Sequence, residues 1–248
     1  MIFDDMTRQG NRLFRYRSFL PFLIVPLAAY YFYGFISAAN FESADIVVQH
    51  IGLGISLLGL ALRGFTVGFT PANTSGRNTT EQKADELNTT GVYSMVRHPL
   101  YTANYIVFAG FLLPFQSLSF FLIATLAFFV YYERIAAAEE VFLEGKFGER
   151  YRSWAAKTPA FFPNPLLWKA PARGFSWRKV LRREPPGWVL VVSYFALFEL
   201  MDDVVFEHEP LTAWLVREPD WAIFLALGLT LYAVSKILRK RTTLLNVS

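Results

Sequence analysis

Long apolar runs alternate with polar segments along the chain of 248 residues. Inside a bilayer no water is present to pair with backbone polar groups, so an apolar run of about 20 residues predicts a membrane-spanning helix. Six spans are predicted, over residues 19–39, 46–69, 99–113, 118–138, 188–206 and 221–237. The pattern is weakest in the third, which Gly110 interrupts, and in the fifth, which ends at Asp202 and Asp203. A partly interfacial position is compatible with either.

The basic residues fall on one side of the membrane when six spans are assumed. Four lie in the N-terminal tail, four between residues 63 and 98, eleven between 134 and 187, and four at the C-terminal end. Arg217 is then the one basic residue in the opposite loops. Because cytoplasmic loops carry an excess of Lys and Arg, both termini and both large polar segments are predicted to be cytoplasmic, with the protein in the inner membrane if the source is bacterial.

Composition agrees with a membrane protein and excludes several kinds of site. Hydrophobic residues make up 54% of the chain and charged residues 18%, whereas soluble domains carry about 25% charged residues. The absence of cysteine excludes disulfides, thiol nucleophiles and cysteine metal sites. The three histidines, His50, His98 and His208, lie far apart, so no multi-histidine metal site is expected. The net charge of +4 fits cytoplasmic loops better than nucleic-acid binding, and no Gly-rich phosphate loop is present.

The chain is predicted to form one domain with three successive regions. Residues 1–90 comprise N-terminal spans and a polar cytoplasmic loop, residues 91–165 a helical hairpin with an interfacial helix, and residues 166–248 the C-terminal spans. The first apolar run is long and no small-residue cleavage motif follows it, so no cleavable signal is predicted.

Two polar segments on the predicted cytoplasmic side have different characters. Residues 70–98 are too long and polar for a simple connector, which favours a binding role or a surface lid. Residues 139–154 are predicted to continue the fourth span as a helix at the membrane surface. A long regular helix is excluded after that point by four prolines, which are Pro159, Pro163, Pro165 and Pro171.

Two motifs lie on either side of the predicted hairpin. From Gly91 to Tyr101 the sequence reads GVYSMVRHPLY, and from Glu139 to Tyr151 it reads EEVFLEGKFGERY. Together they resemble the isoprenylcysteine carboxyl methyltransferase family and its relatives, the membrane phospholipid methyltransferases, over about residues 91–163. The shared pattern is G-x-Y-x-x-x-R-H-P-x-Y, two spans, and E-E-x-x-L-x-x-x-F-G-x-x-Y. The resemblance implies an all-α integral membrane fold with a cytoplasmic S-adenosylmethionine site at the helical hairpin.

The chemistry of the motif residues suits that cofactor. Pro99 fits the first turn of a helix, so Arg97 and His98 are expected at a helix mouth, where exposed backbone donors suit a carboxylate. Aromatic rings suit an adenine or a sulfonium, and carboxylates suit an ammonium or ribose hydroxyls. The cofactor-binding residues implied by the resemblance are Tyr93, Arg97, His98, Pro99, Tyr101, Glu139 and Glu140. A structural histidine, a solvated glutamate pair and interfacial tyrosines are the alternatives.

Arg134 lies late in the fourth predicted span, where an ionisable side chain is costly and indicates function by default. The family has an arginine five residues before the first glutamate of its acidic pair, and Arg134 occupies that position. The resemblance therefore implies a catalytic role for Arg134, which would hold the acceptor oxyanion, together with Glu139. Snorkelling of Arg134 to lipid headgroups is the alternative.

Two further residues are candidates for substrate binding. Asn104 lies one turn into the third predicted span, where it suits either a substrate contact or a polar contact between helices. Arg77 lies in the polar segment and suits an anionic headgroup, and an ordinary solvated loop is the alternative.

The predicted activity is methyl transfer from S-adenosylmethionine to an anionic oxygen of a lipid-like substrate. A phosphate, as in lipid A, is the preferred acceptor, because it is already anionic and fits the basic loop. The carboxylate of an isoprenylated cysteine needs a host that prenylates proteins, and the amine of phosphatidylethanolamine needs a base. A membrane reductase with a nicotinamide cofactor and a non-enzymatic transporter or scaffold are the rival classes. The expected partners are a lipid or lipidated substrate and the membrane; neither nucleic acid nor an obligatory protein partner is indicated.

Overall fold

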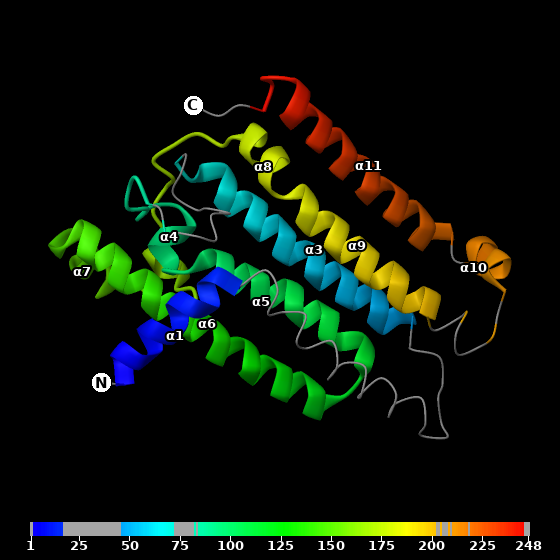
Figure 1. The fold of residues 1–248 in the computed structure, drawn as a ribbon, viewed down its shortest axis with the longest axis horizontal. Helices are drawn as coiled ribbons and strands as arrows, with labels where there is room; N and C mark the ends of the chain where they lie inside the picture. The colour runs from blue at the N-terminus through cyan, green and yellow to red at the C-terminus, as the bar shows by residue number, and fades with distance from the viewer. Residues whose placement is uncertain are drawn as a thin grey trace. The chain divides into compact units, whose positions relative to one another are not determined.

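The computed structural model describes residues 2–16, 46–71, 82, 84–201, 204, 208, 210–217 and 219–245 (Figure 1). These residues form helices, and no strand occurs among them beyond an isolated antiparallel bridge between Gly91 and Lys169. The fold class predicted from the sequence is therefore confirmed as all-helical. The first predicted span, residues 19–39, lies outside the described residues, as does Arg77.

The helices differ in whether their length suits a membrane. The described elements are α1 (Ile2–Tyr16), α3 (Ile46–Phe69), α4 (Val92–Met95), α5 (Pro99–Leu112), η2 (Leu113–Phe115), α6 (Leu118–Phe147), α7 (Glu149–Ala155), η3 (Pro165–Leu167), α8 (Trp177–Arg183), α9 (Pro185–Leu200), α10 (Leu211–Arg217) and α11 (Pro219–Arg241). Three of them, α3, α6 and α11, are long and apolar enough to cross a membrane. Helices α5 and α9 are apolar but shorter, and they correspond to the two spans with the weakest sequence pattern. The total of six spans and the side of each terminus stay predictions.

The chain divides into two compact units, each built from three segments. The first unit contains Met1–Ala29, Thr66–Thr102 and Leu122–Phe175. The second unit contains Tyr30–Phe65, Ala103–Phe121 and Ser176–Ser248. Both motifs of the sequence lie in the first unit. The three successive regions predicted from the sequence stay a prediction.

In the second unit, small residues allow α3 and the later part of α5 to pack closely. A Cβ atom added to Gly110 would lie 2.2 Å from Ser56 Oγ and 2.4 Å from the Gly52 carbonyl oxygen. The Ser56 hydroxyl donates a hydrogen bond of 3.0 Å to the Val107 carbonyl. Small residues at helix contacts are typical of membrane helices, where dispersion contacts replace the hydrophobic effect. Gly110, which weakens the apolar pattern of α5, is therefore a helix-packing residue.

Helices α9, α10 and α11 of the second unit pack on the same core. Helix α11 runs along α9, and a Cβ atom added to Gly228 would lie 2.4 Å from Val192 Cγ2. The buried hydrophobic residues of this core are Leu53, Leu60, Val107, Val191, Phe195, Ala196, Trp214 and Trp221.

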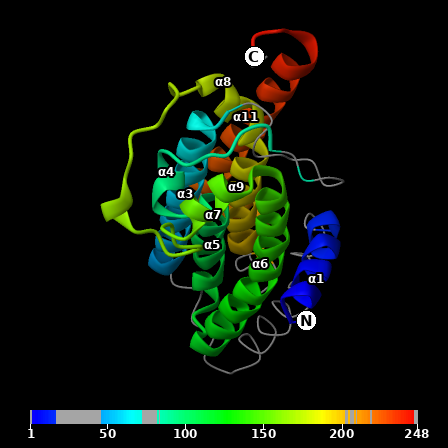
Figure 2. The same ribbon diagram turned by 90° about the vertical axis from the view of Figure 1, so that its left-hand side faces the viewer.

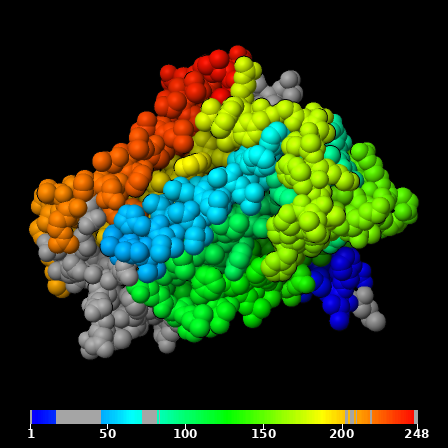
Figure 3. Space-filling model, turned by 180° about the vertical axis from the view of Figure 1, so that it is seen from behind, coloured from blue at the N-terminus to red at the C-terminus, as the bar shows by residue number. Residues whose placement is uncertain are grey.

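In the first unit, a segment without long helices crosses the residues before α5. Two of its carbonyls, those of Pro159 and Ala160, accept backbone hydrogen bonds of 2.8 and 3.1 Å from Arg97 and His98. Further along, the amide of Gly91 donates to the Lys169 carbonyl at 2.9 Å. We call residues 157–172 the strap, and Figure 3 shows this part of the chain in yellow-green on the molecular surface. The prolines exclude a long helix here, as predicted, and the only helical turn is η3.

In the first unit, α6 is followed by α7 and has α1 beside it. Helix α6 continues past the predicted span to Phe147 and then breaks at Gly148, whose φ of 54° lies in the left-handed region, before α7 begins. The sequence predicted one continuous helix over residues 139–154, and this break is the difference. Helix α1 lies beside α6 (Figure 2), where Gly10 meets the Arg134 carbonyl.

Candidate functional site

His98 occupies the turn that leads into α5. Its side chain is buried, and the adjoining Pro99 begins the helix with no N–H to satisfy. The extended backbone at Val96 brings Arg97 and His98 alongside the strap. Because both of their amides already donate to strap carbonyls, these two backbone donors are not available to a cofactor carboxylate. The expectation of free donors at this helix mouth is therefore wrong for Arg97 and His98.

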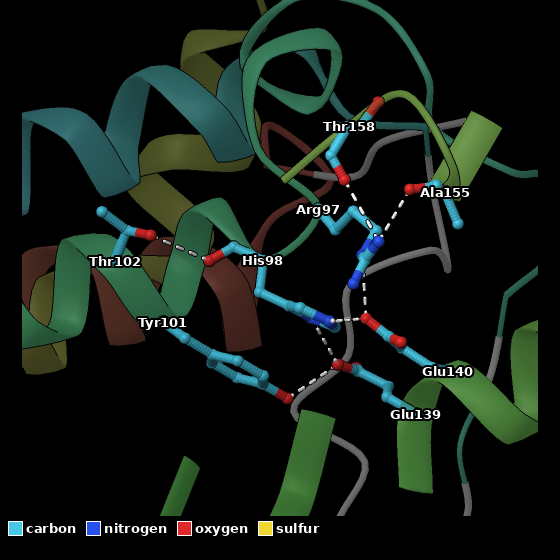
Figure 4. Close-up of polar contacts among 8 residues, drawn as sticks. All are labelled: Arg97, His98, Tyr101, Thr102, Glu139, Glu140, Ala155 and Thr158. Atoms are coloured by element: carbon cyan, nitrogen blue, oxygen red, sulfur yellow. Dashed lines mark hydrogen bonds and ion pairs between the residues drawn. The ribbon is translucent and has the colours of Figure 1, made fainter. Parts of the chain in front are cut away.

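The two acidic residues of the second motif reach His98 from α6 (Figure 4). His98 Nε2 lies 3.0 Å from Glu140 Oε1, and His98 Nδ1 lies 3.4 Å from Glu139 Oε2. One turn into α5, the hydroxyl of Tyr101 donates a hydrogen bond of 2.8 Å to Glu139 Oε2. We call His98, Tyr101, Glu139 and Glu140 the His–Glu cluster. The structure thus brings together residues that stand about 40 positions apart in the sequence.

Arg97 connects the cluster to the strap. Its Nε lies 2.9 Å from Glu140 Oε1, and its Nη1 donates to the carbonyls of Ala155 and Thr158 at 2.7 and 3.1 Å. A guanidinium has its donors in a fixed plane, so these contacts hold both the end of α7 and the carboxylate of Glu140 in place. The observed contacts give Arg97 a positioning role, and its predicted binding of the cofactor stays a prediction.

The two carboxylates control the charge of the imidazole. Burial by itself would lower the pKa of His98, but the hydrogen bonds and charges of Glu139 and Glu140 outweigh it and raise the pKa above its usual value. With His98 protonated, two cationic groups, His98 and Arg97, face two carboxylates, so the group as a whole is close to neutral. Glu139 and Glu140 are partly exposed, with 32% and 23% of their side-chain surface accessible, so a ligand can still reach them.

Aromatic rings border the cluster. The His98 and Tyr101 rings stack with centroids 5.3 Å apart and an angle of 8° between their planes. Phe161 of the strap lies 5.8 Å from His98, and Tyr132 of α6 lies 4.7 Å from Tyr101, both between ring centroids. Thr102 fixes this arrangement, because its hydroxyl donates a hydrogen bond of 2.8 Å to the Phe161 carbonyl. Phe161 and Thr102 carry no sequence signal, since their importance comes only from this contact.

Tyr93 lies on α4 in the same unit. It lines a hollow of about 20 Å³ together with residues that include Phe69, Thr90 and Pro171. This volume suits about one water molecule rather than an adenine. The Tyr93 carbonyl accepts a hydrogen bond of 3.2 Å from Trp154 Nε1, which ties α4 to α7.

Arg134 lies apart from the cluster. Its Nε donates to Gln9 Oε1 of α1 at 2.7 Å, and its Nη1 donates to the Val130 carbonyl at 2.8 Å. Five residues separate it from Glu139, which corresponds to a rotation of about 140° around α6. The structure therefore directs Arg134 to α1, and its catalytic role stays a prediction.

Asn104, a predicted substrate-binding residue, belongs to the second unit. The Asn104 side-chain oxygen accepts a hydrogen bond from Arg63 Nη1, and Arg63 Nε lies 2.9 Å from Glu184 Oε2. Arg63 and Glu184 were not among the sequence candidates. An arginine inside an apolar run is a signal that could have identified Arg63, whereas Glu184 looks like an ordinary polar residue between two short helices.

Comparison with known proteins agrees with the motifs. Residues 49–150 match the family model of phospholipid methyltransferases, which confirms the resemblance to the isoprenylcysteine carboxyl methyltransferase and phospholipid methyltransferase group. Together with the apolar helices, this match supports a membrane methyltransferase.

Two curated relatives match part of the chain. The nickel-cobalt-cadmium resistance protein NccN of Alcaligenes xylosoxydans xylosoxydans is 38% identical over 89 residues, which cover 36% of this chain and 41% of that protein. The cobalt-zinc-cadmium resistance protein CzcN of Cupriavidus metallidurans is 35% identical over 124 residues, which cover 49% of this chain and 54% of that protein. The matches therefore span about half the length of these relatives. No solved structure matches the chain.

Proposed function

We propose that this protein transfers a methyl group from S-adenosylmethionine to an anionic oxygen of a lipid-like substrate. The observation that carries the proposal is the His–Glu cluster, in which the two family motifs meet. The phospholipid methyltransferase match over residues 49–150 includes all four members of the cluster. Three helices suited to a membrane favour a substrate that is itself embedded in lipid.

The donor set of the cluster fits S-adenosylmethionine. Partly exposed carboxylates on Glu139 and Glu140 can accept hydrogen bonds from an ammonium group or from ribose hydroxyls. The aromatic rings of Tyr101 and Phe161 border the cluster and suit an adenine or a sulfonium. When bound, the cofactor supplies an electrophilic methyl group on a sulfonium. His98 fixes the two carboxylates, and the residues around it bind and orient the reactants and exclude water.

A lipid phosphate, as in lipid A, is the preferred acceptor. A phosphate or carboxylate is anionic at neutral pH, so its oxygen needs no strong general base, whereas the amine of phosphatidylethanolamine does. An isoprenylated cysteine carboxylate is the second choice. The proposed role of Arg134 is to hold the acceptor oxyanion, which requires its guanidinium to exchange the contact with Gln9 for the substrate. Asn104 and Arg77 are proposed as further substrate contacts.

Titration calorimetry in detergent tests the cofactor assignment. The wild-type protein is expected to bind S-adenosylhomocysteine, and His98→Ala and Glu139→Gln are each expected to weaken binding by about tenfold or more, since each loses one charge-assisted contact. Glu144→Gln is a matched control, because Glu144 lies on α6 and its only described ion-pair partner is the exposed Arg152. Wild-type affinity for S-adenosylhomocysteine in all three variants would contradict the assignment. Binding of NADPH in place of S-adenosylhomocysteine would favour the reductase.

A second candidate function comes from the names of the two relatives, which are metal-resistance proteins. We infer a contribution of this protein to tolerance of cobalt, nickel or cadmium. Growth of a deletion strain on cobalt, with and without the wild-type gene, measures that contribution. Complementation by the Glu139→Gln variant separates the two functions when methyl transfer by this variant is measured in parallel: growth restored by a variant with no detectable methyl transfer would show that tolerance does not depend on it.

A further inference from the structure

A groove of about 500 Å³ lies between α1 and α6 in the first unit. Its lining residues are Phe3, Asp4, Thr7, Arg8, Asn11, Arg12 and Arg15 of α1 and Val141 of α6. We propose that this groove binds the phosphate headgroup of an anionic membrane lipid. The site is separate from the His–Glu cluster and does not depend on the proposed methyl transfer.

The wall of the groove is held by a close contact between helices. A Cβ atom added to Gly10 would lie 1.9 Å from the Arg134 carbonyl oxygen and 2.9 Å from Ala138 Cβ. Phe14, one turn later on α1, is also buried, and Gln9 accepts the hydrogen bond from Arg134. One face of helix α1 therefore packs on α6, and this contact fixes the position of its arginine-bearing face relative to α6.

The groove carries a concentrated positive charge. Arg8, Arg12 and Arg15 follow one another at spacings of four and three residues, which places them on one side of a helix. All three are exposed, and Asp4 is the only acidic residue in the lining. Arg8 pairs with Asp5 on the same helix, while no described acidic residue forms an ion pair with Arg12 or Arg15. Two guanidinium groups are thus available to an anion, and their planar donors match the oxygens of a phosphate.

Apolar surface next to the arginines indicates a lipid rather than a free phosphate. Phe3 and Val141 line the groove with 54% and 41% of their surface exposed. Val130 and Leu126, which are also exposed, continue this apolar surface along α6, and α6 is one of the three helices long and apolar enough to cross a membrane. A lipid phosphate in the groove would leave its acyl chains beside these side chains. Basic residues at the membrane surface attract anionic lipids in this way.

The groove and the His–Glu cluster use different faces of α6. Arg134, Ala138 and Val141 repeat at spacings of four and three residues and face α1. Glu139 and Glu140 are rotated from Arg134 by more than about 100° in either direction around the helix. A lipid bound at the groove therefore occupies a site other than the one that holds the cofactor in the proposed function.

Native mass spectrometry of the 248-residue chain in detergent tests the proposal, with phosphatidylglycerol, phosphatidylcholine and inorganic phosphate as probes. The wild type is expected to retain phosphatidylglycerol and to bind the other two at least about tenfold more weakly. The Arg12→Gln/Arg15→Gln variant should lose about 30-fold in affinity for phosphatidylglycerol. The matched control is Arg239→Gln/Arg241→Gln, which removes the same charge from the exposed end of α11 and should bind as the wild type does.

Each remaining outcome decides against the proposal in a different way. Inorganic phosphate that binds as tightly as phosphatidylglycerol would indicate an ion site without lipid recognition. An equal loss in the α11 control would indicate unspecific attraction by net charge. If the glutamine variant does not fold, Val141→Trp fills the groove while keeping every charge, and unchanged lipid binding by that variant would overturn the proposal.

Discussion

Removal of the Glu184 carboxylate is expected to destabilise the second unit strongly. Its side chain is 3% exposed and its Oε2 lies 2.9 Å from Arg63 Nε, while the Arg63 side chain is 26% exposed. Arg63 also donates to the side chain of Asn104, so the guanidinium is held in one position. In Glu184→Ala the partly buried cation stays without its counter-charge, which is the costly case for a buried ion pair.

The size of the effect follows from burial. Loss of one partner from a fully buried pair costs about 3–5 kcal/mol, and the residual exposure of Arg63 places this pair near the lower end, at about 3 kcal/mol. For a chain of 248 residues this corresponds to a fall in Tm of roughly 6–12 °C. Replacement of both partners, in Arg63→Met/Glu184→Leu, leaves no unpaired charge, and the free energy of unfolding of this variant should lie within about 1 kcal/mol of the wild-type value.

Thermal unfolding in detergent, followed by tryptophan fluorescence, measures these variants in a double-mutant cycle. Glu144→Ala is the control, because its pair with Arg152 is exposed by 44% and 54% on the two sides and should contribute less than about 1 kcal/mol. A Glu184→Ala variant with the same Tm as the Glu144→Ala control would refute the reasoning. A double variant less stable than Glu184→Ala alone would show that the cost comes from lost packing rather than from an unpaired charge.

Three further predictions follow from other contacts. Arg134→Ala should lose most methyl transfer from labelled S-adenosylmethionine into extracted lipid but keep cofactor affinity, and Arg134→Lys should recover little activity, because an ammonium lacks the planar donors of a guanidinium. Near wild-type activity of Arg134→Lys would instead support snorkelling of this side chain to the lipid headgroups. Gly110→Val should destabilise the protein by about 1–3 kcal/mol or more in thermal unfolding, because Ser56 leaves no room for a side chain, and an unchanged Tm would contradict the close packing of α3 and α5. The raised pKa of His98 contributes stability that is fully present below the usual histidine pKa of 6.5 and is lost as pH rises through the raised pKa. His98→Gln should therefore flatten the dependence of Tm on pH in this range, and an unchanged dependence would exclude His98 as its source.

Several features could be predicted from the sequence because they depend on local composition. The long apolar runs of α3, α6 and α11 are read directly from the chain, since a lipid environment forces such runs into helices. The prolines exclude a long helix in the strap for an equally local reason. The two motifs also indicated the residues of the His–Glu cluster through their family resemblance.

Other features depend on contacts between distant parts of the chain, and only the tertiary structure decided them. Arg97 and His98 stand at a helix mouth as predicted, yet their amides bind the strap some 60 residues away. Arg134 satisfies the family spacing, but its direction was set by Gln9 on α1, a helix in the N-terminal tail that was not among the predicted elements although its apolar residues recur with helical spacing. The partner of Arg63 was likewise hidden, because Glu184 lies 121 positions later. Local patterns report which segments enter the membrane, whereas the partner of each polar side chain depends on which helix faces it.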